Sequence, residues 1–233
     1  MSTLHLHPTA PLAERVLLPG DPGRALLLAQ VLLEQPKMFN HNRGLWGYTG
    51  GAADGEPLTI QSTGMGGPSA AIVIEELARL GARRIVRVGT CGAFAASLAL
   101  GDALVAETSI AADGTSRALG AGERVAADPT LTDALEAAAR ADGGGAVQRG
   151  AILTTDLFYA PDGAHARPVA DGALAIEMEA ATLFQLGALR GLQVGCVLIV
   201  TDLLARPVPE RISAEGLEAA AERVGRIAAA ALS

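Results

Sequence analysis

The sequence of 233 residues is poor in aromatic residues, cysteine and positive charge, and each shortage excludes a class of protein. Aromatic residues make up 3% of the chain, so a hydrophobic core must be built from Ala, Leu, Val and Ile. The only two cysteines, Cys91 and Cys196, lie far apart in apolar segments, which favours reduced buried thiols over a disulfide or a metal site. The net charge of −7 argues against a general nucleic-acid binder, but it permits a local basic pocket for one small anion.

Long hydrophobic runs are also missing. No uninterrupted apolar stretch reaches the roughly 18 residues that span a bilayer, and the first residues, MSTLHLHPTAPLAERV, lack the basic-then-apolar order of a signal peptide. We therefore expect a cytoplasmic protein with neither a membrane nor a nucleic acid as partner. Half of the residues are nonetheless hydrophobic, so a chain of this length can bury a large core, which excludes a disordered scaffold.

Short apolar segments alternate with Ala/Leu/Glu-rich stretches, a pattern typical of an α/β fold with a mixed or parallel sheet. Several apolar segments show no polar alternation, which suits strands covered on both faces. The predicted strands are 16–19, 58–62, 85–90, 103–108, 151–155, 174–177 and 194–201, and the predicted helices are 22–33, 68–80, 131–141, 179–189 and 214–231. Pro22 and Pro68 follow glycine turns, at the first helical position where proline is favoured. Neither a repeat nor an obvious linker interrupts the pattern, so we expect residues 1–233 to form one domain.

Glycine turns and arginines follow several predicted strands, at the sheet edge where α/β proteins bind ligands. Gly20 and the run Gly64–Gly67 lie at strand-to-helix turns, whose backbone amides can bind an anion. Arg24 and Arg87 add guanidinium groups suited to phosphate oxygens, and Thr90 adds a hydroxyl. Either arginine alone is explained as well by a solvated or ion-paired role. Together these residues predict a site for phosphate or sulfate.

Two familiar nucleotide motifs are excluded. The segment 64–69 (GMGGPS) resembles a dinucleotide fingerprint, but it contains a proline, and no acidic residue ends a second strand about 20 residues later. The chain also lacks the G-x-x-x-x-G-K-[ST] pattern of a phosphate-binding loop. We therefore exclude NAD binding and P-loop NTPase chemistry.

Acidic residues also follow predicted strands. Glu177 and Glu179 flank Met178, and such a pair in an extended chain projects to one side, where a carboxylate can accept hydrogen bonds from a vicinal diol. Glu179 is explained equally well as an acid at a helix N-terminus, and Asp202, after an apolar strand, as a helix cap. Phe158 suits either stacking on a planar ring or packing in the core.

In combination, these segments resemble the nucleoside phosphorylases of the purine and uridine phosphorylase superfamily, and among them the bacterial hexameric, purine-type members. The matching stretches are LLPGDPGR (17–24), NRGLWGYTG (42–50), STGMGGPSAAIVIEEL (62–77), RVGTCGA (87–93), DLFYAPDG (156–163), EMEAATLF (177–184) and TD (201–202). They occur in the family's order, and only the last thirty residues match poorly. The resemblance implies a single-domain, three-layer α/β/α fold with a central mixed, partly barrel-like sheet.

The resemblance also implies roles for individual residues. Phosphate would be held by Gly20, Arg24, Arg43, Arg87 and Thr90, ribose by His5, Met65, Met178 and Glu179, and the base by Cys91, Gly92, Phe158, Ile176, Glu177 and Asp202. His5 and Arg43 would complete the site of a neighbouring subunit in a homohexamer built as a trimer of dimers, and His7 is the alternative to His5. The resemblance implies no metal and no organic cofactor. Inorganic phosphate would be the co-substrate.

The implied reaction is the reversible phosphorolysis of purine (2′-deoxy)ribonucleosides to free base and (deoxy)ribose 1-phosphate. Phosphate would attack C1′, and its charge would stabilise the cationic sugar. Asp202 would protonate N7 to make the base a neutral leaving group, although the ordinary pKa of Asp, near ~3.9, requires help from the pocket or the substrate. Purine-type members pair this aspartate with an arginine further along. Arg206 and Arg211 are the candidates here, and neither has the family's spacing.

Three alternatives stay open. A uridine phosphorylase would share the segment 62–82, but that branch recognises its pyrimidine with a Gln that residues 159–167 lack. A nucleosidase that uses water would not need Arg24, Arg43 and Arg87 together. A catalytically silent protein that binds nucleosides or phosphate would have the same fold.

Overall fold

The computed structural model describes residues 3–161, 163–205 and 210–233. Within them, one mixed sheet contains β1 (Arg15–Leu18), β2 (Glu34–Asn40), β3 (Gly47–Gly51), β4 (Pro57–Gln61), β5 (Arg84–Ala93), β6 (Ala103–Ala111), β7 (Arg124–Ala126), β8 (Val147–Thr154), β9 (Ala175–Glu177), β10 (Gln193–Leu203) and β11 (Glu210–Arg211). The helices are α1 (Pro22–Leu32), α2 (Gly67–Leu80), α3 (Gly114–Ala118), α4 (Pro129–Asp142), α5 (Ala166–Ala170), α6 (Ala180–Arg190) and α7 (Ala214–Leu232), with a 3₁₀ turn η1 (Asn42–Gly44).

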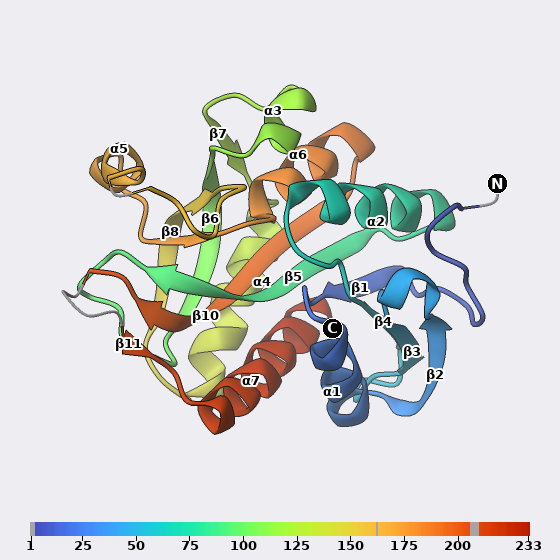
Figure 1. Cartoon of the computed structure of the whole chain (residues 1–233). Helices are drawn as coiled ribbons and strands as arrows, with labels where there is room; N and C mark the ends of the chain where they lie inside the picture. The colour runs from blue at the N-terminus through green and yellow to red at the C-terminus, as the bar shows by residue number, and fades with distance from the viewer. Residues whose placement is uncertain (1–2, 162, 206–209) are drawn as a thin grey trace.

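The sheet has a closed part and an open part (Figure 1). β5 pairs in parallel with β10, β10 pairs antiparallel with β6, β6 and β8 are parallel, β8 and β9 are parallel, and β9 returns antiparallel to β5. These five strands therefore close into a barrel-like ring. From β5 the sheet continues outward through β1, β4, β3 and β2. The predicted mixed, partly barrel-like sheet is confirmed.

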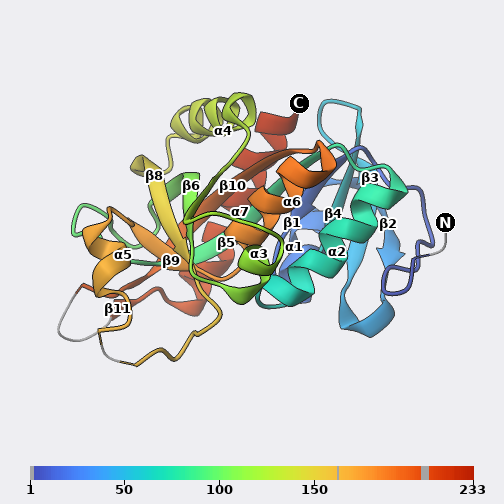
Figure 2. The ribbon, with the colours of Figure 1, turned by 90° about the horizontal axis from the view of Figure 1, so that it is seen from above.

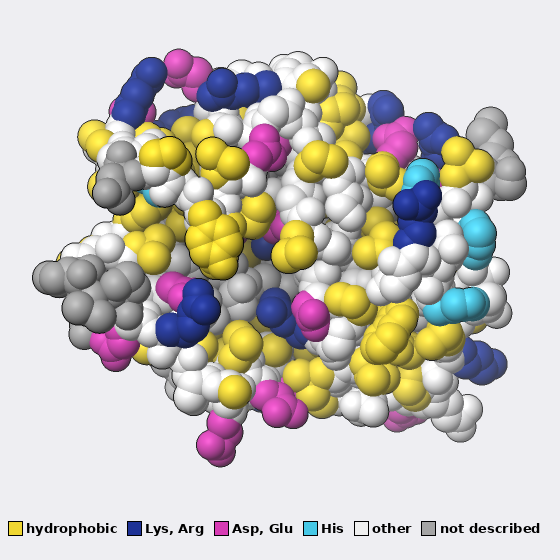
Figure 3. Space-filling model, viewed as in Figure 1, with side chains coloured by type: hydrophobic (Ala, Val, Ile, Leu, Met, Phe, Trp, Pro, Cys, Tyr) yellow, Lys and Arg dark blue, Asp and Glu magenta, His cyan; other side chains and the backbone are white. Residues whose placement is uncertain are grey.

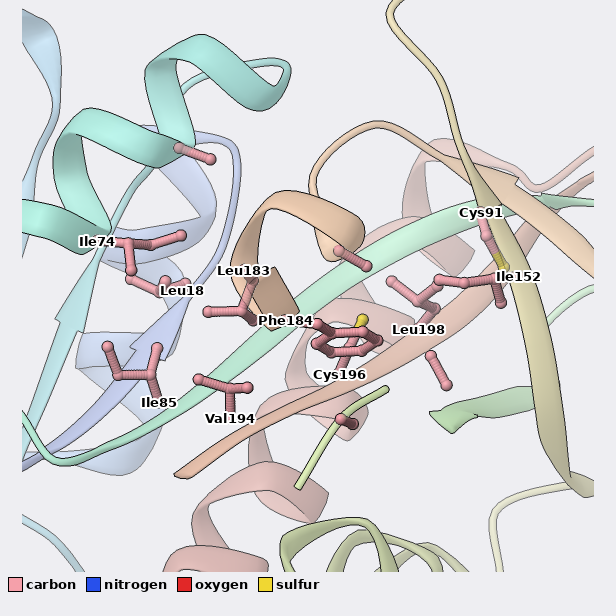
Figure 4. Packing of buried hydrophobic residues seen from close by; sticks show 14 of the residues in the cluster. Leu18, Ile74, Ile85, Cys91, Ile152, Leu183, Phe184, Val194, Cys196 and Leu198 are labelled. Carbon is pink, nitrogen blue, oxygen red and sulfur yellow. The ribbon is translucent and has the colours of Figure 1, made fainter. Parts of the chain in front are cut away.

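Helices cover the two faces of the sheet and give the predicted three layers (Figure 2). Helices α1, α4 and α7 share one core cluster, and α2 and α6 share the other. Strand β10 divides its side chains between the two: Val194, Cys196 and Leu198 belong to the α2/α6 cluster, and Val197 and Ile199 to the opposite one. Figure 4 shows Cys196 and Leu198 packed around Phe184 of α6. Burial on both faces explains why this strand has no polar alternation.

All seven predicted strands and five predicted helices are present, with ends shifted by a few residues. Pro22 and Pro68 lie in the first turns of α1 and α2, as predicted. The sequence did not predict β2, β3 or the short elements β7, β11, α3 and α5. β2 contains a proline and is mostly exposed, and three of the five residues of β3 are glycine. Pairing with β4 makes β3 a strand in spite of that composition. Among the described residues, no helix is both long enough and apolar enough to cross a membrane.

Candidate active site

A pocket of about 650 Å³ lies where β1, β5, β9 and β10 end. In Figure 3, arginine and acidic side chains surround a hollow near the middle of the face shown. The pocket brings together all but two of the predicted site residues: Gly20, Arg24, Met65, Arg87, Thr90, Cys91, Gly92, Phe158, Ile176, Glu177, Met178, Glu179 and Asp202. Only His5 and Arg43 lie elsewhere. The prediction that successive strand ends converge on one site therefore agrees with the geometry.

A second, more open hollow of about 810 Å³ lies against β2, β3 and the C-terminus. Lys37, Arg84 and Arg15 line it, and Arg15 is already bound to Asp54, with Nη1 2.6 Å from Oδ2. None of the predicted site residues lines it. The smaller pocket is therefore the better candidate, because chemical groups rather than size identify an active site.

Two glycine turns and Arg24 form one end of the pocket. The Gly64 amide donates to the Gly20 carbonyl at 2.9 Å, which holds the turns after β1 and β4 together. Gly64 has a φ of 74°, and a Cβ there would lie 2.7 Å from Ser69 Oγ, so a side chain is excluded. Asp21 caps α1 by accepting from the Arg24 amide, which fixes Arg24 in the first turn.

The Arg87 cation lies close enough to Arg24 to change the pKa of the Arg24 guanidinium. Burial and the neighbouring Arg87 cation lower the pKa of Arg24, and Asp21 and Glu179 partly counteract this. Among the described residues, the Arg24 side chain has no hydrogen-bond or ion-pair partner. Two adjacent cations with one left unpaired make a site that attracts an anion.

Arg87 is held between two glutamates at the N-terminus of α6. Its Nε lies 2.8 Å from Glu177 Oε2, and its Nη2 lies 2.5 Å from Glu179 Oε2. All three residues are buried, with 5–6% exposure. Burial alone would lower the pKa of Arg87, but Glu179 and Glu177 outweigh it and raise that pKa. Arg87 is therefore a fixed cation.

Glu177 faces Arg87 rather than the open part of the pocket. Its carboxylate accepts from Thr154 Oγ1 at 2.5 Å and from the amides of Glu179 and Ala180 at 2.8 and 3.0 Å. Thr154 Oγ1 in turn lies 2.7 Å from Ser109 Oγ. Burial raises the pKa of Glu177, whereas Arg87 and these donors favour its charged form. Because every partner is a donor, the carboxylate form fits, and its evident task is to orient Arg87.

Glu179 lines the pocket beside Arg87. Besides Arg87, its carboxylate contacts the Gly66 amide, which donates to Oε1 at 2.5 Å. Met178 and Met65 line the pocket with it, and Met65 is largely exposed. A carboxylate flanked by thioethers in this position suits a polar ring with two adjacent hydroxyls.

Asp202 and Arg211 form the opposite end. A register shift in the pairing of β10 with β5 falls between Val200 and Asp202, which re-aims the side chains at the end of β10. Asp202 pairs with Arg211 of β11, and Arg211 Nε lies 2.5 Å from Asp202 Oδ1. The Thr201 hydroxyl donates to Asp202 Oδ2 at 2.8 Å. The hydrogen bond to Asp202 raises the pKa of Arg211. The other candidate partner, Arg206, lies outside the described residues.

The walls near Asp202 are apolar. Cys91 is buried and directs Sγ toward the Ile199 carbonyl, and burial raises the pKa of its thiol, so Cys91 is part of a wall and not a nucleophile. Gly92 leaves room for Leu204, whose Cδ1 would lie 2.7 Å from a Cβ at that position. Phe158 is 64% exposed and packs edge-on against Tyr159 at 5.0 Å. It can therefore adjust to a planar ring.

His165 is a pocket residue that the sequence analysis missed. Its ring lies 5.6 Å from that of Phe94, and it precedes α5. The loop that carries it also bears Phe158, which was the only available signal. Thr155, Leu157, Thr201 and Leu204 line the pocket too. The first three belong to the strand ends expected to meet at the site, but the sequence assigned none of the four a role.

His5 and Arg43 lie together, away from this pocket. Arg43 is exposed in η1 with a left-handed φ of 58°. The neighbouring Asn42 Nδ2 donates to the His5 carbonyl at 2.9 Å. His7 Nε2 lies 3.3 Å from the Leu4 carbonyl. Most of the histidine surface visible in Figure 3 lies at the right edge of the view, away from the central hollow. Neither His5 nor Arg43 can serve the pocket of its own chain in this arrangement.

Within the described ranges, no group of three or more His, Cys, Asp or Glu side chains is arranged to hold a metal ion.

The sequence profile of the phosphorylase superfamily matches residues 14–233. A protein of Exiguobacterium sp. named purine nucleoside phosphorylase DeoD-type is 38% identical over 196 residues, which cover 83% of this chain and 82% of that protein. Proteins of the same name from Oceanobacillus iheyensis and Geobacillus kaustophilus are 36% and 37% identical, over 197 and 198 residues. Those alignments cover 82% and 83% of this chain, and 83% of each relative.

Proposed function

The chain belongs to the phosphorylase superfamily, and we propose that it catalyses the reversible phosphorolysis of purine nucleosides. One observation carries the proposal: a single pocket has an end with two arginines, a carboxylate beside them and an aspartate–arginine end. That order matches phosphate, ribose and base. The products would be the free purine and ribose or deoxyribose 1-phosphate. The names of the relatives favour a purine over the uridine alternative.

Phosphate would bind at the end formed by Gly20, Arg24, Arg87 and Thr90. Arg24 supplies a cation that the described residues leave unpaired, and Arg87 adds a buried cation already fixed by Glu177. Held there, phosphate would attack C1′ of the sugar, and its negative charge would stabilise the oxocarbenium-like transition state. In this proposal Glu177 contributes by orienting Arg87, which refines the base contact that the family resemblance implies.

Glu179 would bind the 2′- and 3′-hydroxyls of ribose, with Met178 and Met65 beside the sugar. The hydroxyls would donate to the carboxylate that now contacts Arg87 and the Gly66 amide. Ribose placed there lies between the phosphate and the base, as a displacement at C1′ requires. Cys91, Gly92, Ile176 and Phe158 would enclose the purine.

Asp202, a carboxylate paired with Arg211 in the free protein, would take up a proton from solvent as the nucleoside binds and deliver it to N7 of the departing purine. Arg211 is its proposed partner. The 2.5 Å contact between Arg211 Nε and Asp202 Oδ1 supports this choice. As Asp202 gives up its proton, the adjacent guanidinium would stabilise the carboxylate that forms. Neutral purine is a much better leaving group than its anion, so the step assists cleavage of the glycosidic bond.

His5 and Arg43 are proposed to complete the site of a neighbouring copy in a hexamer built as a trimer of dimers. His5 would meet the 5′-hydroxyl of ribose, and Arg43 would reach the phosphate. Their location outside their own pocket supports this assignment, as does the left-handed backbone at Arg43, because such conformations cluster at functional sites.

We further propose that residues 1–233 act as one domain in the cytoplasm, with phosphate as co-substrate and no other cofactor. The single continuous sheet of the described residues supports one domain. The two unpaired cysteines, Cys91 and Cys196, support a reducing compartment.

The experiment that tests this function is base release from inosine, adenosine, guanosine and uridine, each with and without phosphate, followed by ultraviolet absorbance. Purine release that requires phosphate supports the proposal and ranks the bases. Release without phosphate would indicate a hydrolase, and uridine cleavage would indicate the pyrimidine branch. Inosine binding without turnover would indicate a silent binding protein.

A further inference from the structure

A buried carboxylate on α2 binds the N-terminal segment. Glu76 is 6% exposed, and its carboxylate accepts hydrogen bonds from the amides of Leu4, His5 and Leu6 at 3.1, 3.1 and 2.7 Å. The His5 ring adds a further contact, with Nδ1 2.8 Å from Glu76 Oε1. One side chain thus satisfies three consecutive backbone donors and one imidazole nitrogen.

These contacts decide the charge of Glu76. Burial alone would raise the pKa of the carboxyl, but the hydrogen bonds from Leu6, His5 and Leu4 outweigh it and hold that pKa below its ordinary value. Glu76 is therefore a carboxylate, which only accepts hydrogen bonds. It follows that His5 Nδ1 carries a proton in this contact.

The same contacts hold His5 in place. Chain ends are usually poorly ordered unless they are tied down. Here Leu6 is fully buried in the α2/α6 core cluster, and Asn42 Nδ2 donates to the His5 carbonyl. The His5 side chain is nevertheless 25% exposed. Within the described residues, its Nε2 has no hydrogen-bond partner.

We propose that Glu76 is a positioning residue for ribose recognition: it holds His5 in the tautomer protonated at Nδ1, so that Nε2 accepts a hydrogen bond from the 5′-hydroxyl. The proposal rests on the proposed function, in which His5 meets that hydroxyl in a neighbouring copy. A neutral imidazole has one donor and one acceptor nitrogen, and the partner of one nitrogen determines the role of the other. Without Glu76, either nitrogen could carry the proton and the ring could turn.

The test compares nucleosides with and without the 5′-hydroxyl. The ratio of kcat/KM for inosine to kcat/KM for 5′-deoxyinosine isolates the contribution of that hydroxyl. We expect Glu76→Gln to lower this ratio about tenfold, the effect of one hydrogen bond. Glu75→Gln is the matched control, because Glu75 is the adjacent residue of α2 and pairs only with Arg79 and Arg190 at the surface among the described residues. It should leave the ratio unchanged.

A double-mutant cycle separates positioning from general destabilisation. His5→Ala should lower the ratio as Glu76→Gln does, and adding Glu76→Gln to His5→Ala should lower it no further. A ratio that Glu76→Gln leaves unchanged, while His5→Ala lowers it, would overturn the proposal. A ratio that His5→Ala leaves unchanged would also overturn the proposal for Glu76. The proposed function would still stand if the wild type released hypoxanthine only in the presence of phosphate. If the wild type released hypoxanthine without phosphate, both the proposed function and the proposal for Glu76 would fail.

The tautomer can also be measured without a substitution at Glu76. Long-range ¹⁵N–¹H correlation spectra of the wild-type protein distinguish the two ring nitrogens of each histidine, and His5→Ala identifies the signals of His5. We expect Nδ1 to carry the proton in the neutral ring. A spectrum with the proton on Nε2 would contradict the proposal even if Glu76→Gln failed to fold.

Discussion

The two ends of the pocket differ in how firmly the protein holds them. At the phosphate end, Arg87, Glu177 and Glu179 are buried and bonded to one another and to backbone amides. At the base end, Phe158 is mostly exposed and the Arg211 side chain is 67% exposed. The phosphate end is thus organised before a substrate arrives, whereas the base end has room to close around one. Groups aimed in advance at developing charge are the most effective catalytically.

The two ends of the pocket also differ in how closely the segments that build them resemble the family. The phosphate end is built from segments that resemble the family closely, such as 17–24 and 87–93. The base end also draws on matching segments such as 156–163 and 201–202, but it adds Leu204 and Arg211, which lie in the last thirty residues, where the resemblance is poor. If the proposed function holds, we expect the chemistry common to the superfamily to depend on the rigid end, and the choice of base to depend in part on Leu204 and Arg211.

The largest effect is expected from Arg87→Ala. It should reduce kcat/KM for inosine about a thousandfold, because phosphate loses a fixed cation. It should also reduce the free energy of unfolding by about 3–5 kcal/mol, because two buried carboxylates lose their partner. Phosphorolysis rates and urea denaturation measure the two losses. Arg79→Ala, which breaks an exposed pair with Glu75 on α2, is the control and should change neither appreciably. A stable Arg87→Ala protein would show that the phosphate end is less rigid than described.

Asp202→Asn should separate catalysis from stability. We expect kcat/KM for inosine and adenosine to fall about a hundredfold, the usual contribution of a general acid, with little change in unfolding free energy. Phosphate binding should survive. A nucleoside already methylated at N7, such as 7-methylguanosine, leaves without a proton, so its phosphorolysis should be nearly unaffected.

Equal losses on the methylated and unmethylated nucleosides would assign Asp202 to binding rather than proton transfer. An unchanged rate on inosine would remove Asp202 from the mechanism. A large loss of stability would mean that the base end is as tightly built as the phosphate end.

The core of the fold was predictable because both faces of the central strands are buried. Val194 to Val200 form an apolar run that only a doubly covered strand explains. β3 was not predictable in this way, since three of its five residues are glycine and its partner β4 makes it a strand. The extension of β5 beyond Thr90 depends on β9 and β10, because Gly92 pairs with Ile176 and with Asp202, both more than eighty residues away. Pairing between distant segments leaves no local signal.

The site shows the same limit. Gly20, Arg24 and Arg87 were predictable as an anion site, because glycine turns and arginines after strands have a direct physical meaning. The orientation of Glu177 toward Arg87 was not, because it depends on Thr154 and on the amides that begin α6. Glu76 gave no sequence signal at all, since an acid on a helix usually faces water and its partners lie about seventy residues earlier.

Arg211→Ala tests the base end and should have the smallest effect of the three substitutions on kcat/KM. The Arg211–Asp202 pair joins an exposed guanidinium to a partly exposed carboxylate, so its contribution is partly screened by solvent. We expect kcat/KM for inosine to fall about tenfold at low ionic strength, and the difference from wild type to narrow as salt is added, because salt screens exposed charges. Arg226→Ala, in an exposed pair with Glu222 on α7, is the control for net charge. A loss that is independent of salt would indicate that Arg211 works in a closed site, and would place the base end in the same rigid class as the phosphate end.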